Sequence, residues 1–480
     1  MGRALTRIDI FVVASALAAL ALTALNIAGQ LIAALILVLG ALYVRRGRWQ
    51  MVPLLIVVAI MGVASWVWKE DGFAVWALVA SLLAIGIGVL PLWLSPVPRL
   101  PSPSGKYAVG LRIMDLRETC QAQVYLWYPA DSGQKGPFRP YHTMNEANAI
   151  AKGMKTLGAP GFFNRHLQLV RTHTLIDPPM ASGRFPMIVF NHGGGLYPMQ
   201  STALMEELAS HGFLIASIGH AGGSLGLAFE DGSHSAITPS GYEAIRGDEA
   251  FQEACADIIL AADRSARDAA RERLSILPET GLSRTVKTWA QTSQKVLDIL
   301  LAEDGAKHSV LDHADPAKIA AVGMSLGGAT ALRLCLEDPR IKAGIVLDGI
   351  YWCFDDQGRC LDTPLLQFYS DPSKGAKQAS KMAQRDFIEP DLDKTGFVND
   401  WIVENASAPV LQFLGIGLDH MDFTDRIFGK TSLEGSQPLS PAKAGAAINR
   451  LCRVFLRATL DGIAINEVDE VTEPPLQKIS

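Results

Sequence analysis

Long apolar runs dominate the first 94 residues of the chain. They cover residues 10–25, 27–44, 51–68 and 73–94, and polar breaks at 26–30, 45–50 and 69–72 separate them. Each run is close to the roughly 17–25 residues that a helix needs to cross the hydrocarbon of a bilayer. Four tryptophans lie near the run ends, as is typical of interfacial aromatic residues: Trp49, Trp66, Trp68 and Trp93. The pattern predicts an all-α region of about four transmembrane helices.

Three alternatives stay open for this region. The first run follows Arg3 and Arg7 and so also fits a signal peptide, although no clear small-residue cleavage site separates it from the second run. The runs also fit buried helices of a soluble core. The first two runs share a very short connection, which fits an interfacial or re-entrant hairpin.

Positive residues are unevenly distributed around the runs. Arginines precede the first run, and three more occupy residues 45–50, whereas 26–30 has no Lys or Arg and 69–72 has one Lys against two acids. Because positive loops stay in the cytoplasm, four spans predict a multi-pass protein of a bacterial inner membrane with its large domain on the cytoplasmic side. Three spans would reverse the side of that domain.

Beyond the apolar runs, the sequence divides into three parts. Residues 95–106 (SPVPRLPSPSGK) are rich in Pro and Ser, which predicts a stiff, extended linker. Residues 107–466 form the predicted main domain, and residues 467–480 form a C-terminal tail.

The main domain alternates apolar strand-like segments with helical segments. Predicted strands lie at 120–129, at the start of 185–195, where glycines end the strand, at 212–220, at the start of 318–328, where a sharp turn follows, and at 341–349, 363–371 and 408–417. Continuous apolar strands separated by helices predict an α/β fold with a mostly parallel sheet covered by helices on both faces. Ligands of such sheets bind at the carboxyl ends of the strands. Residues 231–315 are helical and charged, which predicts an insertion that is either a lid or a helix pair packed on the sheet.

Charge follows the same division. The first 94 residues hold nine charged side chains and a net charge of +3, while the remaining 386 hold 82 and a net charge of −8, which together give −5. The second part is therefore close to an ordinary globular composition. This distribution excludes a uniform soluble protein, a disordered chain and a basic nucleic-acid binder, so we expect no nucleic-acid partner.

The six cysteines do not identify a compartment. Cys120, Cys255, Cys335 and Cys452 are expected to be buried. Cys353 and Cys360 flank a predicted turn and are a candidate hairpin disulfide. The spacing of Cys and His suggests no zinc site, and we expect no metal and no cofactor.

A G-x-S-x-G pentapeptide, residues 323–327, is the first candidate for chemistry. It follows an apolar strand and precedes a helix, the context in which glycines permit a sharp turn that exposes the serine hydroxyl. Ser325 is therefore the predicted nucleophile. The start of the following helix places the amides of Ser325 and Leu326 where an oxyanion would be stabilised.

A second glycine-rich segment, NHGGG at 191–195, follows the strand that begins at 185. Backbone amides of such a loop supply a second oxyanion donor, with Gly194 as the choice and Gly193 as the alternative. His192 in this loop is expected to be structural. His220 also ends a strand and is a candidate for lining the pocket.

The predicted general base is His420, because it is the one histidine that follows Ser325 in the chain and the order of this fold is serine, acid, histidine. The acid that orients it is left open by the residues. Asp348 and Asp371 each end a strand after the nucleophile. Asp419 and Asp422 adjoin the histidine, but such close neighbours rarely orient the same ring.

Three segments together resemble the plasma-type platelet-activating factor acetylhydrolase family, α/β-hydrolases related to dienelactone hydrolases. They are KIAAVGMSLGGATALRLCLEDPRIKAGIVLDGIYW, LASHGFLIASIGH and HMDFTD, and the resemblance covers roughly residues 107–460. It implies that the acid is Asp348, in the context Leu347-Asp348, and that the oxyanion donors are Gly194 and Leu326. Met324 and Gly194 depart from the residues usual in the family, and residues 1–94 lie outside its shared domain.

These observations predict a membrane-anchored serine hydrolase of carboxylic esters. The resemblance implies short or oxidised acyl esters of phospholipids as substrates. The alternatives are an esterase of a small soluble ester or lactone, and a non-catalytic membrane scaffold or sensor that keeps the hydrolase fold.

Overall fold

The computed structural model describes residues 13–14, 36–42, 44, 47–67, 96–275, 281–303, 308, 310–351, 358–430, 440–462 and 473–479. Most of the predicted runs 10–25, 27–44 and 73–94 lie outside these residues. The third run forms helix α3 (Val52–Val67), which follows the short helix η1 (Trp49–Met51). In the described part of the chain, no helix has both the length and the hydropathy that a membrane span requires. The four-helix transmembrane prediction therefore finds no support there.

An eleven-stranded sheet forms the centre of the main domain. Its order is β13-β12-β11-β10-β9-β5-β6-β2-β1-β4-β3. The six strands from β12 to β6 run parallel, and β2 joins β6 antiparallel. The strands are β1 (Ala108–Leu116), β2 (Ala122–Ala130), β3 (Phe138–Pro140), β4 (Arg171–Ile176), β5 (Phe185–Asn191), β6 (Leu214–His220), β9 (Ala314–Met324), β10 (Ile341–Leu347), β11 (Leu365–Tyr369), β12 (Val410–Gly415) and β13 (Leu476–Lys478).

The strands of the parallel core are buried over most of their length, and β9 is buried from Ile319 to Met324 after a more exposed start. This burial explains why their sequences are continuously apolar rather than alternating. The predicted strands at 120–129, 212–220, 341–349, 363–371 and 408–417, and those that begin at 185 and 318, are confirmed within a few residues. The mostly parallel sheet expected of an α/β-hydrolase is likewise confirmed. Within the predicted tail at 467–480, residues Leu476–Lys478 form β13 and pair antiparallel with β12.

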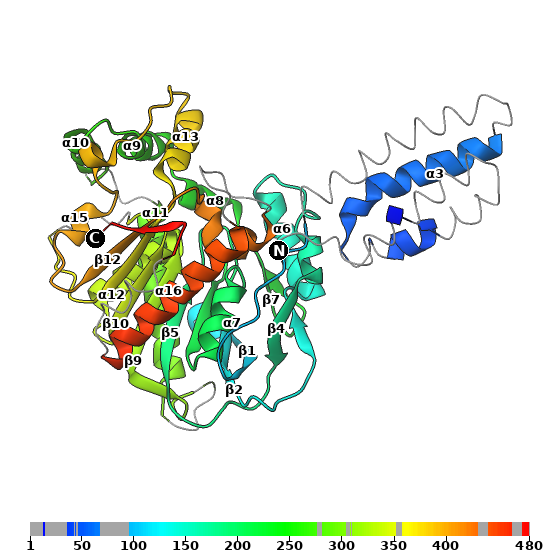
Figure 1. The fold of residues 1–480 in the computed structure, drawn as a ribbon, viewed down its shortest axis with the longest axis horizontal. Helices are drawn as coiled ribbons and strands as arrows, with labels where there is room; N and C mark the ends of the chain where they lie inside the picture. Colours follow the sequence, from blue (N-terminus) through cyan, green and yellow to red (C-terminus); the bar gives the residue numbers. More distant parts are fainter. Residues whose placement is uncertain are drawn as a thin grey trace.

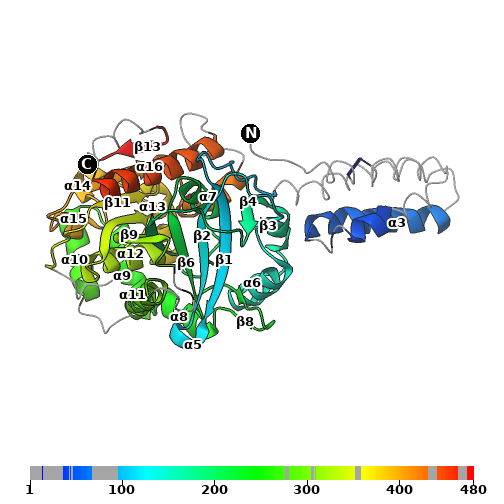
Figure 2. The same cartoon turned by 90° about the horizontal axis from the view of Figure 1, so that it is seen from below.

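Helices cover both faces of this sheet, so the domain has three layers (Figure 2). One face carries α7 (Thr202–Ser210) and α16 (Pro441–Asp461), and the other carries α11 (Gly281–Leu300) and α12 (Leu326–Glu337). The remaining described helices are α5 (Arg117–Cys120), α6 (Met144–Thr156), α8 (Pro239–Arg246), α9 (Glu249–Ile259), α10 (Arg264–Ser275), α13 (Pro372–Ala383), α14 (Leu392–Thr395), α15 (Asp400–Val403), η2 (Arg165–Leu169), η4 (His420–Phe423) and η5 (Asp425–Gly429).

The predicted insertion at 231–315 contains α8 to α11. Helix α11 buries an apolar face against the core, and this face includes Val286, Trp289 and Val296. The helix therefore packs on one face of the sheet. The lid alternative does not describe α11, whereas the helix-packing alternative does. A small hairpin of β7 (Leu227–Ala228) and β8 (His234–Ser235) precedes these helices.

The segment at 96–106 is extended, as predicted, but it is packed on the domain rather than free. Val97 and Leu100 are buried in the core on the α7–α16 side. The amide and the hydroxyl of Ser104 each donate a hydrogen bond to Glu207 of α7. The Pro-rich segment therefore runs along the surface of the domain and is bound to it.

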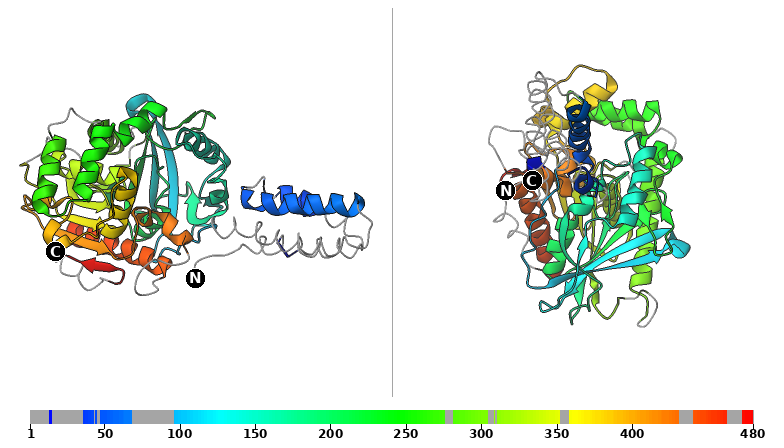
Figure 3. Two further views of the ribbon diagram at one scale, coloured as in Figure 1. Left: turned by 90° about the horizontal axis from the view of Figure 1, so that it is seen from above. Right: turned by 90° about the vertical axis from the view of Figure 1, so that its right-hand side faces the viewer.

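Helix α3 projects from the side of the domain that carries α6 (Figure 1 and Figure 3). The segment just before it is fixed on the domain, since Trp49 stacks on Phe163 with ring centroids 5.3 Å apart and packs edge-on against Phe162 at 5.1 Å. Arg48 is completely buried at this contact. One of the three arginines at 45–50, which contributed to the predicted orientation, is thus part of a packed interface.

The burial predicted for four cysteines is observed for three of them. Cys120, Cys335 and Cys452 are buried, whereas Cys255 is half-buried. Cys360 is exposed and carries a free thiol, and Cys353 lies outside the described residues. The candidate Cys353–Cys360 disulfide therefore lies partly outside the described residues.

Candidate active site

Ser325 lies at a sharp turn between β9 and α12. Its backbone adopts φ 55° and ψ −121°, which is rare for a residue with a side chain. The neighbouring glycines make this turn possible, because a Cβ at Gly323 would stand 2.0 Å from the carbonyl oxygen of Gly327, and one at Gly327 would stand 2.0 Å from that of Asn191. The chain therefore holds the Ser325 hydroxyl at the carboxyl end of β9.

His420 reaches Ser325 from the loop after β12. Its Nε2 lies 3.0 Å from Oγ of Ser325, and its Nδ1 lies 2.6 Å from Oδ2 of Asp348. Asp348 follows β10, and its other oxygen accepts a 2.6 Å hydrogen bond from the amide of Ser370. The serine, the histidine and Asp348 thus form one continuous chain of hydrogen bonds from three separate strand ends.

The pKa of His420 is raised above its ordinary value of 6.5. Burial opposes the charged ring and lowers the pKa, but the hydrogen bond to Asp348 and the negative charges of Asp348 and Asp419 outweigh it. Asp348 therefore favours a protonated imidazole, the form that exists after a base has accepted a proton.

Asp371, the alternative acid, lies elsewhere. It is the N-cap of α13, where its Oδ1 accepts from the amide and the hydroxyl of Ser373. Its Oδ2 accepts from the amide of Gly417 at 2.9 Å. These contacts occupy both oxygens and assign Asp371 a role in loop structure.

Asp419 and Asp422 flank the histidine but bind other groups. Each accepts a hydrogen bond from the backbone of the other's segment in a capping box around η4. Lys430 Nζ lies 2.6 Å from Asp422 and also pairs with Asp419. The ammonium group of Lys430 thus compensates the two carboxylates beside His420.

The two predicted oxyanion donors lie on facing elements. Leu326 is the first residue of α12, where its amide has no partner within the helix. Gly194 approaches Leu326 closely, since a Cβ at Gly194 would stand 3.4 Å from Cδ2 of Leu326. The amide of Gly193, the alternative donor, instead donates to Oε1 of Gln200 at 2.9 Å.

The side chains of His192 and His220 are buried and pair with groups other than Ser325, His420 and Asp348. His192 Nε2 pairs with the hydroxyl of Ser224 at 2.6 Å, and His220 Nε2 pairs with Oδ1 of Asn191 at 2.9 Å. His220 also stacks on Trp289 with ring centroids 4.1 Å apart. Burial lowers the pKa of both rings, that of His192 to about 4. The structural expectation for His192 agrees with this packing, whereas the pocket role predicted for His220 has no support.

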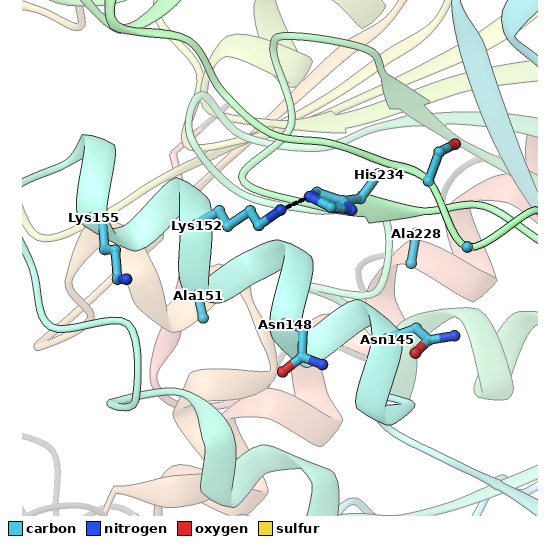
Figure 4. Close-up of a pocket in the computed structure, with 9 residues that line it drawn as sticks. Asn145, Asn148, Ala151, Lys152, Lys155, Ala228 and His234 are labelled. Atoms are coloured by element: carbon cyan, nitrogen blue, oxygen red, sulfur yellow. Dashed lines mark hydrogen bonds between the residues drawn. The ribbon is translucent and has the colours of Figure 1, made fainter.

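A cavity of about 460 Å³ opens elsewhere, between α6 and the β7–β8 hairpin (Figure 4). Its lining includes Asn148, Lys152, Lys155 and His234. The serine, His420 and Asp348 do not contribute to it.

Sequence reasoning missed two groups that touch the site. The amide of Ser370 and the side chain of Gln200 act across 22 and 7 residues, respectively. Gln200 precedes a helix in a polar loop, where a glutamine carries no motif. No pattern in the chain signals either contact.

The sequence of the chain matches a known protein family and its members. Residues 94–425 match the family described as platelet-activating factor acetylhydrolase, isoform II. The platelet-activating factor acetylhydrolase of Canis lupus familiaris is 27% identical over 54% of this chain and 56% of its own length. That of Cavia porcellus is 25% identical over 62% of this chain and 65% of its own length. The chain thus spans between about half and two thirds of these two relatives.

A solved structure shares the fold. It is a ferulic acid esterase from Streptomyces cinnamoneus, 20% identical, with a TM-score of 0.56. The match covers 80% of this chain and 99% of the esterase chain.

Proposed function

The chain belongs to the platelet-activating factor acetylhydrolase isoform II family, and we propose that it is a serine hydrolase of carboxylic esters. The observation that carries the proposal is the hydrogen-bonded series Ser325–His420–Asp348 at the carboxyl ends of three parallel strands. Activity in named relatives of the same family and the shared fold of an esterase support the reaction class.

The proposed reaction begins with Ser325. Its Oγ attacks the ester carbonyl while His420 Nε2 accepts the hydroxyl proton. Asp348 holds the Nδ1 proton of the ring and stabilises the imidazolium that forms. The amides of Gly194 and Leu326 donate to the oxyanion.

The second half of the reaction releases the products. His420 gives its proton to the leaving alcohol, and the acyl group stays on Ser325 as an ester. A water molecule then attacks this acyl-enzyme while His420 accepts its proton, and His420 returns that proton to Oγ of Ser325 as the bond to the acyl group breaks and the carboxylic acid leaves. Both halves use the same donors and the same base.

We propose short-chain or oxidised acyl esters of phospholipids as the substrate class. The family membership supports this class. The test compares hydrolysis of an sn-2 acetyl phospholipid, an sn-2 palmitoyl phospholipid and p-nitrophenyl acetate. A kcat/KM at least about tenfold higher for the sn-2 acetyl lipid than for the other two is expected. Preference for p-nitrophenyl acetate favours the small-ester alternative, and no turnover of any ester favours the scaffold alternative.

Attachment to lipid through the N-terminal region is a separate part of the proposal. Helix α3 exposes Val52, Ile56, Ile60 and Val63, which recur at helical spacing along one face. Apolar side chains in this arrangement fit the hydrocarbon boundary of a membrane. Flotation of the full chain with phosphatidylcholine vesicles tests it, and recovery of all protein in the lipid-free fraction would contradict it.

A further inference from the structure

Gln200 lies at a junction of three segments that carry the proposed chemistry. It precedes α7 and is 2% exposed. Its side-chain Oε1 accepts the amide of Gly193, in the loop that holds Gly194, at 2.9 Å. Its backbone carbonyl accepts the amide of Asp425, five residues after His420, at 2.8 Å. One residue therefore contacts both the oxyanion loop and the segment of the general base.

Asp425 closes this junction from the other side. The two oxygens of its carboxyl group accept the amides of Thr202 and Ala203, the first residues of α7, at 2.6 Å and 3.0 Å. The segment from His420 to Asp425 is thus fixed on the start of α7 by three hydrogen bonds.

The contact with Gly193 determines which amide of the glycine loop stays available. Gly193 packs directly on the nucleophile turn, since a Cβ there would stand 3.0 Å from Sδ of Met324 and 3.5 Å from Cβ of Ser325. An amide is a donor, so its partner on Gln200 must be the carbonyl oxygen. With the Gly193 amide occupied, the next amide, that of Gly194, is left for an oxyanion.

The amide nitrogen of the Gln200 side chain, unlike its oxygen, makes no hydrogen bond to the described residues. This Nε2 atom is buried. An unpaired buried donor costs free energy, so packing alone favours an apolar side chain of the same shape at this position. What a glutamine provides here, and an apolar side chain cannot, is the oxygen that accepts the Gly193 amide.

We propose that Gln200 is a positioning residue of the hydrolase: it accepts the Gly193 amide, presents the Gly194 amide to the oxyanion, and holds this loop at a fixed place relative to the His420 segment. The inference rests on the proposed serine-hydrolase function. Gln200 acts through Gly194 and His420 and does not contact the substrate.

The test replaces Gln200 with methionine, which keeps the shape and removes the acceptor. Complete loss of an oxyanion donor costs about 10²–10³ in kcat, so partial misplacement of Gly194 is expected to lower kcat about 10- to 100-fold with KM changed less than about threefold. The affinity for a trifluoromethyl ketone analogue of the substrate is expected to fall by the same factor as kcat/KM. The melting temperature is expected to change little, because a lost hydrogen bond and a removed orphan donor offset each other.

Gln123→Met is the matched control. Gln123 is also buried, also makes one side-chain hydrogen bond, to the carbonyl of Ala228, and also has one unpaired polar atom. It lies on β2, away from the loops of the site, so kcat is expected to stay at the wild-type value. An equal loss of kcat in both variants would assign the effect to general packing and overturn the proposal.

Gln200→Glu is the second variant, because its carboxyl group retains an acceptor for Gly193. We expect turnover within about fivefold of wild type, since the effect of losing the oxyanion donor is avoided. Turnover as low as that of Gln200→Met, or full activity in Gln200→Met, would contradict the positioning role.

Labelling of Ser325 by a fluorophosphonate separates this inference from the proposed function. Phosphonylation uses the same oxyanion donors without an ester substrate. If wild-type protein labels but hydrolyses no ester, the proposed function fails alone. The labelling rates of the Gln200 and Gln123 variants then still support or overturn the positioning role.

Discussion

At the scale of single residues, the orientation of His420 depends on one carboxylate. We predict that Asp348→Asn lowers kcat by about 10³–10⁴-fold, because an amide at this place favours the wrong tautomer of the ring. Asp371→Asn is expected to lower kcat less than about threefold, since Asp371 caps α13 and does not touch the ring. Steady-state kinetics of both variants measures this, and a larger loss in Asp371→Asn would overturn the assignment of the acid.

The pH dependence of turnover follows from the same contact. His420 acts as a base only when neutral, and its pKa is raised by Asp348 and Asp419 against the effect of burial. We predict that kcat/KM rises with pH through a half-point above 6.5. In Asp348→Asn, the raising charge is lost and the half-point is expected to move to lower pH.

The pH profiles of wild type, Asp348→Asn and Asp371→Asn check this prediction. The half-point of Asp371→Asn should equal that of wild type. A half-point in Asp348→Asn that is unchanged or moves upward would show that another group controls the acid limb.

The candidate residues were predictable from the sequence to different degrees. His420 was identified because no other histidine follows Ser325. The residues alone did not distinguish Asp348 from Asp371, because both follow neighbouring parallel strands, and only the family resemblance favoured Asp348. The direction of each side chain depends on tertiary contacts, here the Ser370 amide for Asp348 and the Gly417 amide for Asp371.

At the scale of elements, the turn between β9 and α12 depends on the absence of a side chain at Gly327. We predict that Gly327→Ala destabilises the fold by about 1–3 kcal/mol or more, because its Cβ would meet the Asn191 carbonyl and separate the glycine loop from the nucleophile. Turnover should fall more than about tenfold, since the oxyanion donors move apart. Thermal unfolding and kinetics measure the two effects.

Gly375→Ala serves as the control for this prediction. Gly375 lies within α13, and no atom lies within 4 Å of a Cβ added there. Alanine in a helix interior is favoured over glycine by about 0.5–1 kcal/mol, so this variant should be equally or more stable. Equal stability of Gly327→Ala and Gly375→Ala would contradict the steric account of the turn.

Some elements of the fold could be predicted from the pattern of apolar residues, and others could not. The parallel core strands were predicted because complete burial makes their sequence continuously apolar. Strand β13 was missed, because it has three residues, two of them exposed, and is formed by pairing with β12 alone. The packing of residues 96–106 was also missed, since Pro and Ser predict an extended backbone but do not indicate what it contacts.

At the scale of the whole molecule, the N-terminal region is joined to the hydrolase domain by packing as well as by the chain. Trp49 contacts Phe162 and Phe163, and its Nε1 donates to the carbonyl of Phe163 at 3.2 Å. We predict that Trp49→Ala loosens this contact, because each aromatic pair contributes about 0.5–1.5 kcal/mol. Hydrogen exchange of η2 amides should become faster while ester turnover stays unchanged.

Phe138→Ala is the comparison, since Phe138 is 63% exposed on β3. It should leave the exchange of η2 unchanged. If the η2 amides of Trp49→Ala exchange no faster than those of wild type, residues 47–51 do not stabilise the domain surface.

The role of Ser325 as nucleophile is tested by fluorophosphonate labelling of the full chain followed by peptide mass spectrometry, on wild type and Ser325→Ala. We predict that wild-type protein is labelled at Ser325, the group 3.0 Å from His420 Nε2. We also predict that Ser325→Ala is unlabelled and loses ester turnover by at least about 10³-fold. Equal labelling or equal turnover of the two proteins would show that Ser325 is not the nucleophile.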